Sequence, residues 1–196
     1  MSKNIILCGV GGQGTVLASK LLAYAAMAKN LNVMSAETIG MAQKGGSVFS
    51  YLRIGNDIHS PMIGRKGADI IIGFEPAEAV RMLPYLREDG TVIVSSKAVI
   101  PVTASLSGAG YDAGEMLDYL RKKVKKLIVV DADKACSEIG TSKVMNLLML
   151  GVLVRSGAVS FTADDIKDAV RAKVNPKFHE LNFRALDYIP ERQIIG

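Results

Sequence analysis

The residues with the clearest chemistry follow the first apolar run of the chain. Asn4–Cys8 is short and of β type, and an apolar helical pattern starts near Thr15. The loop between them reads Gly9-Val10-Gly11-Gly12-Gln13-Gly14. This is G-x-G-x-x-G in its strand–turn–helix context, where glycines permit positive φ and the helix N-terminus offers free N–H groups to an anion. The pattern favours a phosphate or diphosphate site, although it is common enough that the glycines could serve only a tight turn.

An acidic residue bears on whether this loop serves a dinucleotide. Glu37 ends the second apolar run, 37 − 14 = 23 positions after Gly14. That is near the roughly 20 positions typical of a carboxylate that binds a ribose hydroxyl. A stand-alone NAD(P)-binding dehydrogenase is therefore one interpretation. Against it, a polar amide such as Gln13 is unusual inside a dehydrogenase loop, and no catalytic His–Lys pair can be placed.

The glycine loop lies in a chain in which short runs rich in Ile and Val alternate with helical patterns. We expect strands at Asn4–Cys8, Asn32–Ala36, Asp69–Gly73, Thr91–Ser95 and Leu127–Val130. We expect helices at Thr15–Lys29, Pro76–Leu86, Gly114–Lys123 and Lys143–Arg155. Continuous apolar runs suit strands covered on both faces. The alternation predicts an α/β fold with a Rossmann-like, doubly wound, mostly parallel sheet.

Two parts of the chain differ from this alternation. Ser47–Ile54 alternates in polarity and ends in Gly55-Asn56-Asp57, which predicts a strand entering a tight turn as an antiparallel edge element. The C-terminal part is helical, with a capping-box start at Thr162 and Asp165 and a second helix after Pro176. We predict a single domain over residues 1–196, with an α/β core in 1–160 and a helical extension in 161–196.

Composition excludes several classes of protein. The 196 residues carry a net charge of +5, too weak and scattered to indicate nucleic-acid binding. Two cysteines, Cys8 and Cys136, cannot supply the four ligands of an iron–sulfur cluster, and two histidines speak against zinc, so we predict no metal site. No apolar stretch approaches the roughly 20 residues of a membrane span. We predict a cytoplasmic protein without membrane contact.

Further motifs follow the glycine loop in order. They are Glu37-Thr-Ile-Gly-Met-Ala-Gln43-Lys44-Gly45-Gly46-Ser47-Val48, Phe74-Glu75-Pro76, Glu78-Ala79, Leu83-Pro84-Tyr85-Leu86, Asn146 with Leu150-Gly151, and Lys177-Phe178 with Leu181-Asn182. With the glycine loop, they resemble the beta subunit of indolepyruvate:ferredoxin oxidoreductase. That subunit is similar to the gamma subunit or domain of pyruvate and other 2-oxoacid:ferredoxin oxidoreductases. The resemblance covers nearly the whole chain.

The resemblance implies a reaction and a partner. The reaction is oxidative decarboxylation of a 2-oxoacid, indolepyruvate or another aryl-pyruvate, to acyl-CoA with reduction of ferredoxin. In that family a larger subunit carries thiamine diphosphate, Mg and the iron–sulfur clusters. This chain agrees by lacking a GDG-type motif and sufficient cysteines. We expect an obligate half of a hetero-oligomer, inactive alone, that reaches ferredoxin through its partner. A non-catalytic scaffold subunit is the alternative.

The resemblance also concentrates on the segment before the strand at 47–54. Its Gln43, Lys44, Gly45, Gly46 and Ser47 offer an amide, a cation, backbone donors and a hydroxyl. We expect this segment to line a cleft in which the glycine loop (Gly9, Gly11, Gly12, Gln13 and Gly14) holds the diphosphate of coenzyme A. Lys44 would pair with a phosphate as a point charge. The family more often has Arg at this position, so this chain departs there from a residue that could bind a phosphate in a bidentate manner. Alternatively, the two glycines only relieve crowding and Lys44 is solvated.

Two carboxylates attract a second interpretation. Glu75 and Glu78 follow the strand predicted at Asp69–Gly73 and could form an acid–base pair. Negative charge at a helix start is the commoner role for such residues, above all for Glu78. We assign no catalytic residue from the sequence.

Overall fold

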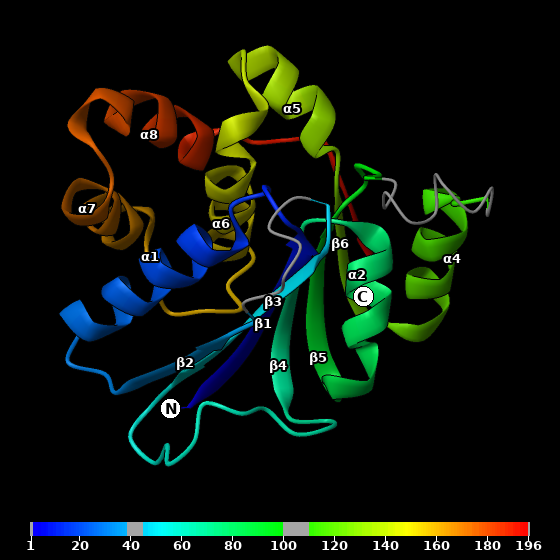
Figure 1. Ribbon diagram of the computed structural model, residues 1–196, viewed down its shortest axis with the longest axis horizontal. Helices are drawn as coiled ribbons and strands as arrows, with labels where there is room; N and C mark the ends of the chain where they lie inside the picture. The colour runs from blue at the N-terminus through cyan, green and yellow to red at the C-terminus, as the bar shows by residue number, and fades with distance from the viewer. Residues whose placement is uncertain (1, 39–44, 100–109, 196) are drawn as a thin grey trace.

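The computed structural model describes residues 2–38, 45–99 and 110–195. One seven-stranded sheet crosses this part of the chain in the order β2-β3-β1-β4-β5-β6-β7, with helices on both faces (Figure 1). The strands are β1 (Lys3–Val10), β2 (Val33–Glu37), β3 (Ser47–Ile54), β4 (Ala68–Gly73), β5 (Leu86–Ser95), β6 (Lys126–Val130) and β7 (Arg192–Ile195). The α/β, doubly wound class predicted from the sequence is confirmed.

The helices divide between the two faces of the sheet. They are α1 (Thr15–Ala28), α2 (Pro76–Met82), α4 (Ala113–Lys123), α5 (Ala132–Ile139), α6 (Met145–Arg155), α7 (Ala163–Lys173) and α8 (His179–Asp187), with 3₁₀ turns at Leu83–Tyr85, Ser142–Val144 and Pro176–Phe178. Along β1, Ile5 and Leu7 pack towards the α1 and α6 core, whereas Ile6 and Cys8 pack towards α2 and α4. Burial on both faces explains why the strands read as unbroken apolar runs.

The strand β3 is antiparallel, as predicted, but it does not lie at an edge. It pairs with β1 from Lys3↔Ile54 to Val10↔Ser47, and on its other side with β2. The edge is β2, a shorter strand whose Met34 is exposed. An eight-residue strand can satisfy its backbone on both sides, and short strands suit edges. The chain from α1 therefore does not return directly beside β1, as the Rossmann pattern would have it.

The C-terminal part is helical through α8 and then returns to the sheet. The capping box of α7 is present: the Thr162 N–H donates to Asp165 Oδ2 at 2.7 Å, and the Asp165 N–H donates to Thr162 Oγ1 at 3.2 Å. The last strand, β7, was not predicted; it pairs antiparallel with β6 and forms the second edge. Four residues are too few to carry a periodic signal, so this pairing depends on β6 being available.

One helix ends earlier than the sequence predicts. Pro76–Leu86 was expected to be one helix, but α2 ends at Met82, and a 3₁₀ turn containing Pro84 leads straight into β5. Proline lacks the N–H that a helix interior requires, which accounts for the early end.

In the described residues, no single helix is long and apolar enough to cross a membrane. One pair of helices, Ala132–Ile139 and Ser142–Arg155, meets the length and composition of a span when taken together, but the pair is bent by 119°.

Candidate functional site at the carboxyl ends of β1 and β4

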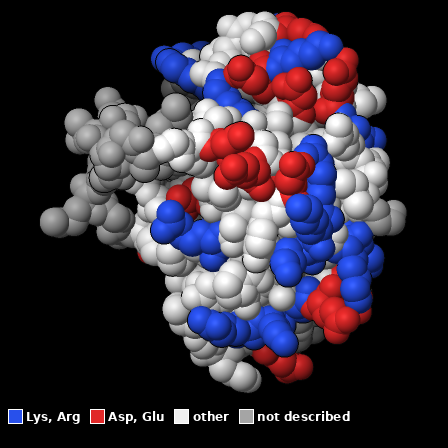
Figure 2. Space-filling view, turned by 90° about the vertical axis from the view of Figure 1, so that its right-hand side faces the viewer, with Lys and Arg blue, Asp and Glu red and all other residues white. Residues whose placement is uncertain are grey.

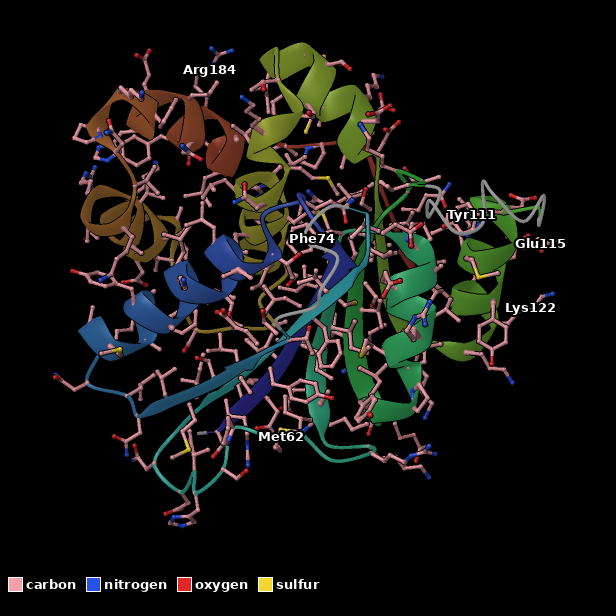
Figure 3. All side chains as sticks on the ribbon, in the orientation of Figure 1. Met62, Phe74, Tyr111, Glu115, Lys122 and Arg184 are labelled. Carbon is pink, nitrogen blue, oxygen red and sulfur yellow. The ribbon has the colours of Figure 1, made fainter. Side chains whose placement is uncertain are left out.

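The predicted glycine loop lies where the sheet changes direction. From β1 the chain proceeds to β2 and β3 on one side, whereas β4, β5 and β6 continue in parallel on the other. In open α/β sheets, ligands bind beyond the carboxyl ends of the strands at such a point. The glycine loop follows β1, and Phe74 follows β4 (Figure 3). Glu75 comes next in the chain. This edge is therefore the candidate site.

Gln13 ties the glycine loop to the neighbouring strand. Its Oε1 accepts the Val10 N–H at 2.7 Å, and its Nε2 donates to the Phe74 carbonyl oxygen at 3.0 Å. A Cβ atom on Gly9 would lie 2.6 Å from that Oε1 and 2.9 Å from Phe74 Cβ. The first glycine is therefore needed for space. The Gln13 amide, predicted to bind the cofactor, is instead turned inward and holds the loop in shape.

The other glycines leave one side of the loop open. Gly12 has φ +105°, and a Cβ atom there would meet nothing within 4 Å. Gly14 has φ +80° and precedes α1 without a side-chain cap, and the first turn of α1 carries no acidic residue. The uncapped N–H groups of this 14-residue helix are thus free to bind an anion. The geometry fits the predicted diphosphate site.

The structure brings the second predicted segment to the glycine loop. The Gly11 N–H donates to the Gly46 carbonyl oxygen at 2.9 Å, because β3 begins beside the end of β1. Gly45 has φ +80°, a turn conformation that suits glycine. Ser47 donates its hydroxyl hydrogen to Glu78 Oε2 at 2.5 Å. Gln43 and Lys44 lie outside the described residues.

The two carboxylates belong to the start of α2. Glu75 is the N-cap, and its Oε2 accepts the Glu78 N–H at 3.0 Å. The other oxygen of Glu75 accepts from the Tyr111 hydroxyl, and Glu78 accepts from Ser47 and lies 3.5 Å from Arg81. Both side chains are buried. The predicted role at the helix start is confirmed for both: Glu75 is the N-cap residue, and Glu78 is the acidic residue of the first turn. Nothing in the sequence indicated the Tyr111 contact, since the pair is 36 residues apart.

Burial and these acids set the ionisation of two neighbours. Burial, followed by the charges of Glu78 and Glu75, raises the pKa of the Cys8 thiol well above its ordinary value. Burial and the hydrogen bond to Glu75 raise the pKa of the Tyr111 hydroxyl in the same way. Cys8 therefore stays a neutral, buried thiol, as its position in an apolar strand indicated. Tyr111 stays protonated and remains a hydrogen-bond donor.

The described residues do not suit a metal or a cluster. Cys8 and Cys136 are both buried and unpaired, and they belong to cores on opposite faces of the sheet. Within residues 2–38, 45–99 and 110–195, no three His, Cys, Asp or Glu side chains gather where they could hold a metal ion. With two separated cysteines, this chain does not supply the four thiolates that an iron–sulfur cluster requires.

The position of Glu37 in the fold argues against a dinucleotide site. Glu37 ends β2, but β3 lies between β2 and β1. In a Rossmann dinucleotide site, the acidic residue ends the strand next to the glycine loop. One inserted strand adds about 4.8 Å of separation. Glu37 is therefore displaced from the position in which it would bind the ribose of a nucleotide held by this loop.

A run of five cations, Arg121-Lys122-Lys123-Val124-Lys125-Lys126, closes α4 and leads into β6. Figure 2 shows Lys and Arg on this side of the molecule interspersed with Asp and Glu. Arg121 pairs with Asp118 at 2.7 Å, and Lys125 lies 2.9 Å from Glu88 and 3.7 Å from Asp89. Such exposed pairs contribute little stability. Two of the cations in this run, Arg121 and Lys125, therefore have acidic partners.

Comparison with known proteins identifies the family. Residues 4–189 match the family described as pyruvate ferredoxin/flavodoxin oxidoreductase. The chain belongs to this family. The indolepyruvate oxidoreductase subunit IorB of Archaeoglobus fulgidus is 37% identical over 187 residues, which are 95% of this chain and 92% of that protein. The subunit of the same name from Thermococcus kodakarensis is 35% identical over 94% of this chain and 92% of its own length.

Solved structures agree with this family assignment. The pyruvate oxidoreductase subunit PORC of Thermotoga maritima has a TM-score of 0.66 and 27% identity, over 95% of this chain and 93% of its own. A 2-oxoglutarate:ferredoxin oxidoreductase of Magnetococcus marinus, with coenzyme A among its bound molecules, has a TM-score of 0.70. At 15% identity, over 95% of this chain and 30% of that one, it shows the fold alone. The chain corresponds over its length to the small-subunit members of the pyruvate ferredoxin/flavodoxin oxidoreductase family.

Proposed function

We propose that this chain is the smaller subunit of a thiamine-diphosphate-dependent 2-oxoacid:ferredoxin oxidoreductase that uses indolepyruvate or a related aryl-pyruvate. A larger partner subunit carries thiamine diphosphate, Mg and the iron–sulfur clusters, and passes electrons to ferredoxin. This chain holds the diphosphate of coenzyme A, whose thiol accepts the acyl group. The single observation that carries the proposal is the Gly11–Gly46 hydrogen bond, which joins both predicted loops at one edge of the sheet.

The chain's own residues bind and orient in this scheme. The open face of Gly12 and the uncapped N-terminus of α1 receive the diphosphate, while Gln13 keeps the loop in its receiving shape. Ser47 is already bonded to Glu78, so it positions the second segment and does not contact the ligand. The binding roles of Gln43 and Lys44 stay predictions, as do the cytoplasmic location and the single-domain organisation.

The choice of oxoacid rests on relatives. Four proteins that are 32–37% identical over at least 94% of this chain are named indolepyruvate oxidoreductase subunits. Proteins named as the gamma subunit common to pyruvate and ketoisovalerate oxidoreductases are more distant; the one from Pyrococcus furiosus is 28% identical. We propose that the partner subunit forms the oxoacid pocket, because the resemblance places thiamine diphosphate, with which the oxoacid reacts, on that subunit.

The test is reconstitution with the larger subunit. We expect oxoacid- and CoA-dependent ferredoxin reduction from the complex, faster with indolepyruvate than with pyruvate or 2-oxoglutarate, and none from this chain alone. Gly12→Asp should raise the KM for coenzyme A by placing a carboxylate against the diphosphate. Gly157→Asp is the matched control, because Gly157 also has positive φ and open space, at the far end of α6. Normal CoA kinetics with Gly12→Asp would favour a scaffold role for the loop.

A further inference from the structure

A buried amide without a hydrogen-bond acceptor lies beside the glycine loop. Asn146 is the second residue of α6 and is 3% exposed. Its Oδ1 accepts the N–H of Leu147 at 3.0 Å, which identifies the other terminal atom as Nδ2. In the described part of the chain, Nδ2 donates to no acceptor. Among the described residues, Ser50 Oγ is the fully buried polar side-chain atom without a partner, so Asn146 Nδ2 is reached from the surface and is open to an incoming acceptor.

The amide faces Gly14. A Cβ atom on Gly14 would lie 2.8 Å from Nδ2 and 3.0 Å from the Asn146 amide carbon. A glycine is therefore required at position 14 for two reasons: any side chain there would collide with Asn146, and the backbone has a φ of +80°. Because Gly14 immediately precedes α1 and Asn146 lies in the first turn of α6, this contact places the starts of the two helices side by side.

Both helix starts favour negative charge. Neither α1 nor α6 carries an acidic residue in its first turn, so no carboxylate there offsets the partial positive charge of either helix start. The free N–H groups belong to α1, because Thr141 caps the turn that leads into α6, the Met145 N–H donates to the Ser142 carbonyl oxygen, and the Leu147 N–H donates to Asn146 Oδ1. The chain thus brings together the uncapped N-terminus of α1, a glycine loop with an open face, and the Asn146 amide donor, and this donor set suits a phosphoryl group.

We infer that Asn146 Nδ2 donates a hydrogen bond to an oxygen of a phosphoryl group seated at the glycine loop between the N-termini of α1 and α6. That this group belongs to coenzyme A rests on the proposed function. The inference itself concerns the phosphoryl group and the residue that orients it. Gly14 and Asn146 then act together, because the absence of a side chain at Gly14 lets the Asn146 amide approach the loop.

Asn146→Asp is the decisive substitution. The carboxylate keeps an oxygen for the Leu147 N–H and adds negative charge at the start of α6, so folding should be unharmed. It removes the donor and opposes the incoming anion. Asn146→Ala removes the donor without adding charge. Asn182→Asp is the matched control, because Asn182 is another buried asparagine whose Nδ2 already donates to the Phe178 carbonyl oxygen at 2.7 Å, within its own segment.

The experiment is calorimetric titration of the reconstituted complex with coenzyme A and, separately, with inorganic pyrophosphate. We expect the Kd for both probes to rise about tenfold with Asn146→Ala and about a hundredfold with Asn146→Asp, and to be unchanged with Asn182→Asp. A Kd for coenzyme A unchanged in both Asn146 variants overturns the inference while leaving the proposed function standing. Pyrophosphate binding that Asn146→Asp abolishes, without coenzyme A binding, supports the inference and refutes the CoA assignment. Failure of the wild-type complex to bind either probe overturns the inference.

Discussion

The inward-turned amide of Gln13 leads to a prediction that separates loop shape from ligand contact. Gln13→Met keeps the length and approximate volume of the side chain but removes both of its hydrogen bonds, to the Val10 N–H and the Phe74 carbonyl oxygen. Each partly buried bond contributes about 1 kcal/mol. The loss of both should lower the free energy of unfolding by about 2 kcal/mol. For a domain of this size, that corresponds to a fall in Tm of roughly 4–8 °C.

The same change should weaken coenzyme A binding, although Gln13 is not expected to touch the ligand. Without these two hydrogen bonds the free loop samples more conformations, so it must become ordered when the anion binds. This entropic cost should raise the Kd for coenzyme A several-fold. The measurements are thermal unfolding of the chain and calorimetric titration of the complex. Gln193→Met is the control, since Gln193 is exposed and its amide oxygen accepts only from Arg121. A Tm and a Kd both unchanged in Gln13→Met would refute this account of the loop.

Three further predictions test other parts of the structure. Gly151→Ala should cost about 1–3 kcal/mol by overpacking, because its Cβ would overlap the Leu186 carbonyl oxygen, whereas Gly64→Ala meets open space and should change Tm little; chemical denaturation measures both. Burial opposes ionisation of Asp165, but the Thr162 N–H and Lys29 outweigh it and lower the pKa, so Asp165→Asn should lose about 1 kcal/mol at pH 7. Since a lowered pKa stabilises only above the ordinary value near 4, that deficit should shrink as the pH falls below it; a constant deficit would contradict the assignment. Finally, burial raises the pKa of the thiols of Cys8 and Cys136, so iodoacetamide at pH 8 should label neither in the native chain and both after denaturation, as mass spectrometry can show.

Local pattern was enough to locate most of the elements. Unbroken Ile and Val runs marked the buried parallel strands, and Ser47–Ile54 was predicted with its observed bounds because alternation and the Gly55 turn delimit a strand locally. The capping box of α7 and the glycine loop were also readable, since each depends on residues within a few positions of one another. Local residue patterns of this kind therefore predict which face of an element is buried and which backbone angles a turn requires.

Partner choice was decided only by the tertiary structure. Periodicity states that Ser47–Ile54 is a strand, but its place between β2 and β1 depends on backbone bonds to segments far along the chain. Long-range packing also decides the pairing of β7 with β6 and the hydrogen bond from Ser47 to Glu78. It likewise decides the approach of the Asn146 amide to Gly14, which is 146 − 14 = 132 positions away along the chain. The sequence by itself determined a loop that can receive an anion. The fold decided that Gln13 shapes this loop, that Glu37 lies apart from it, and that a buried amide faces it, because each depends on which distant segments pack together.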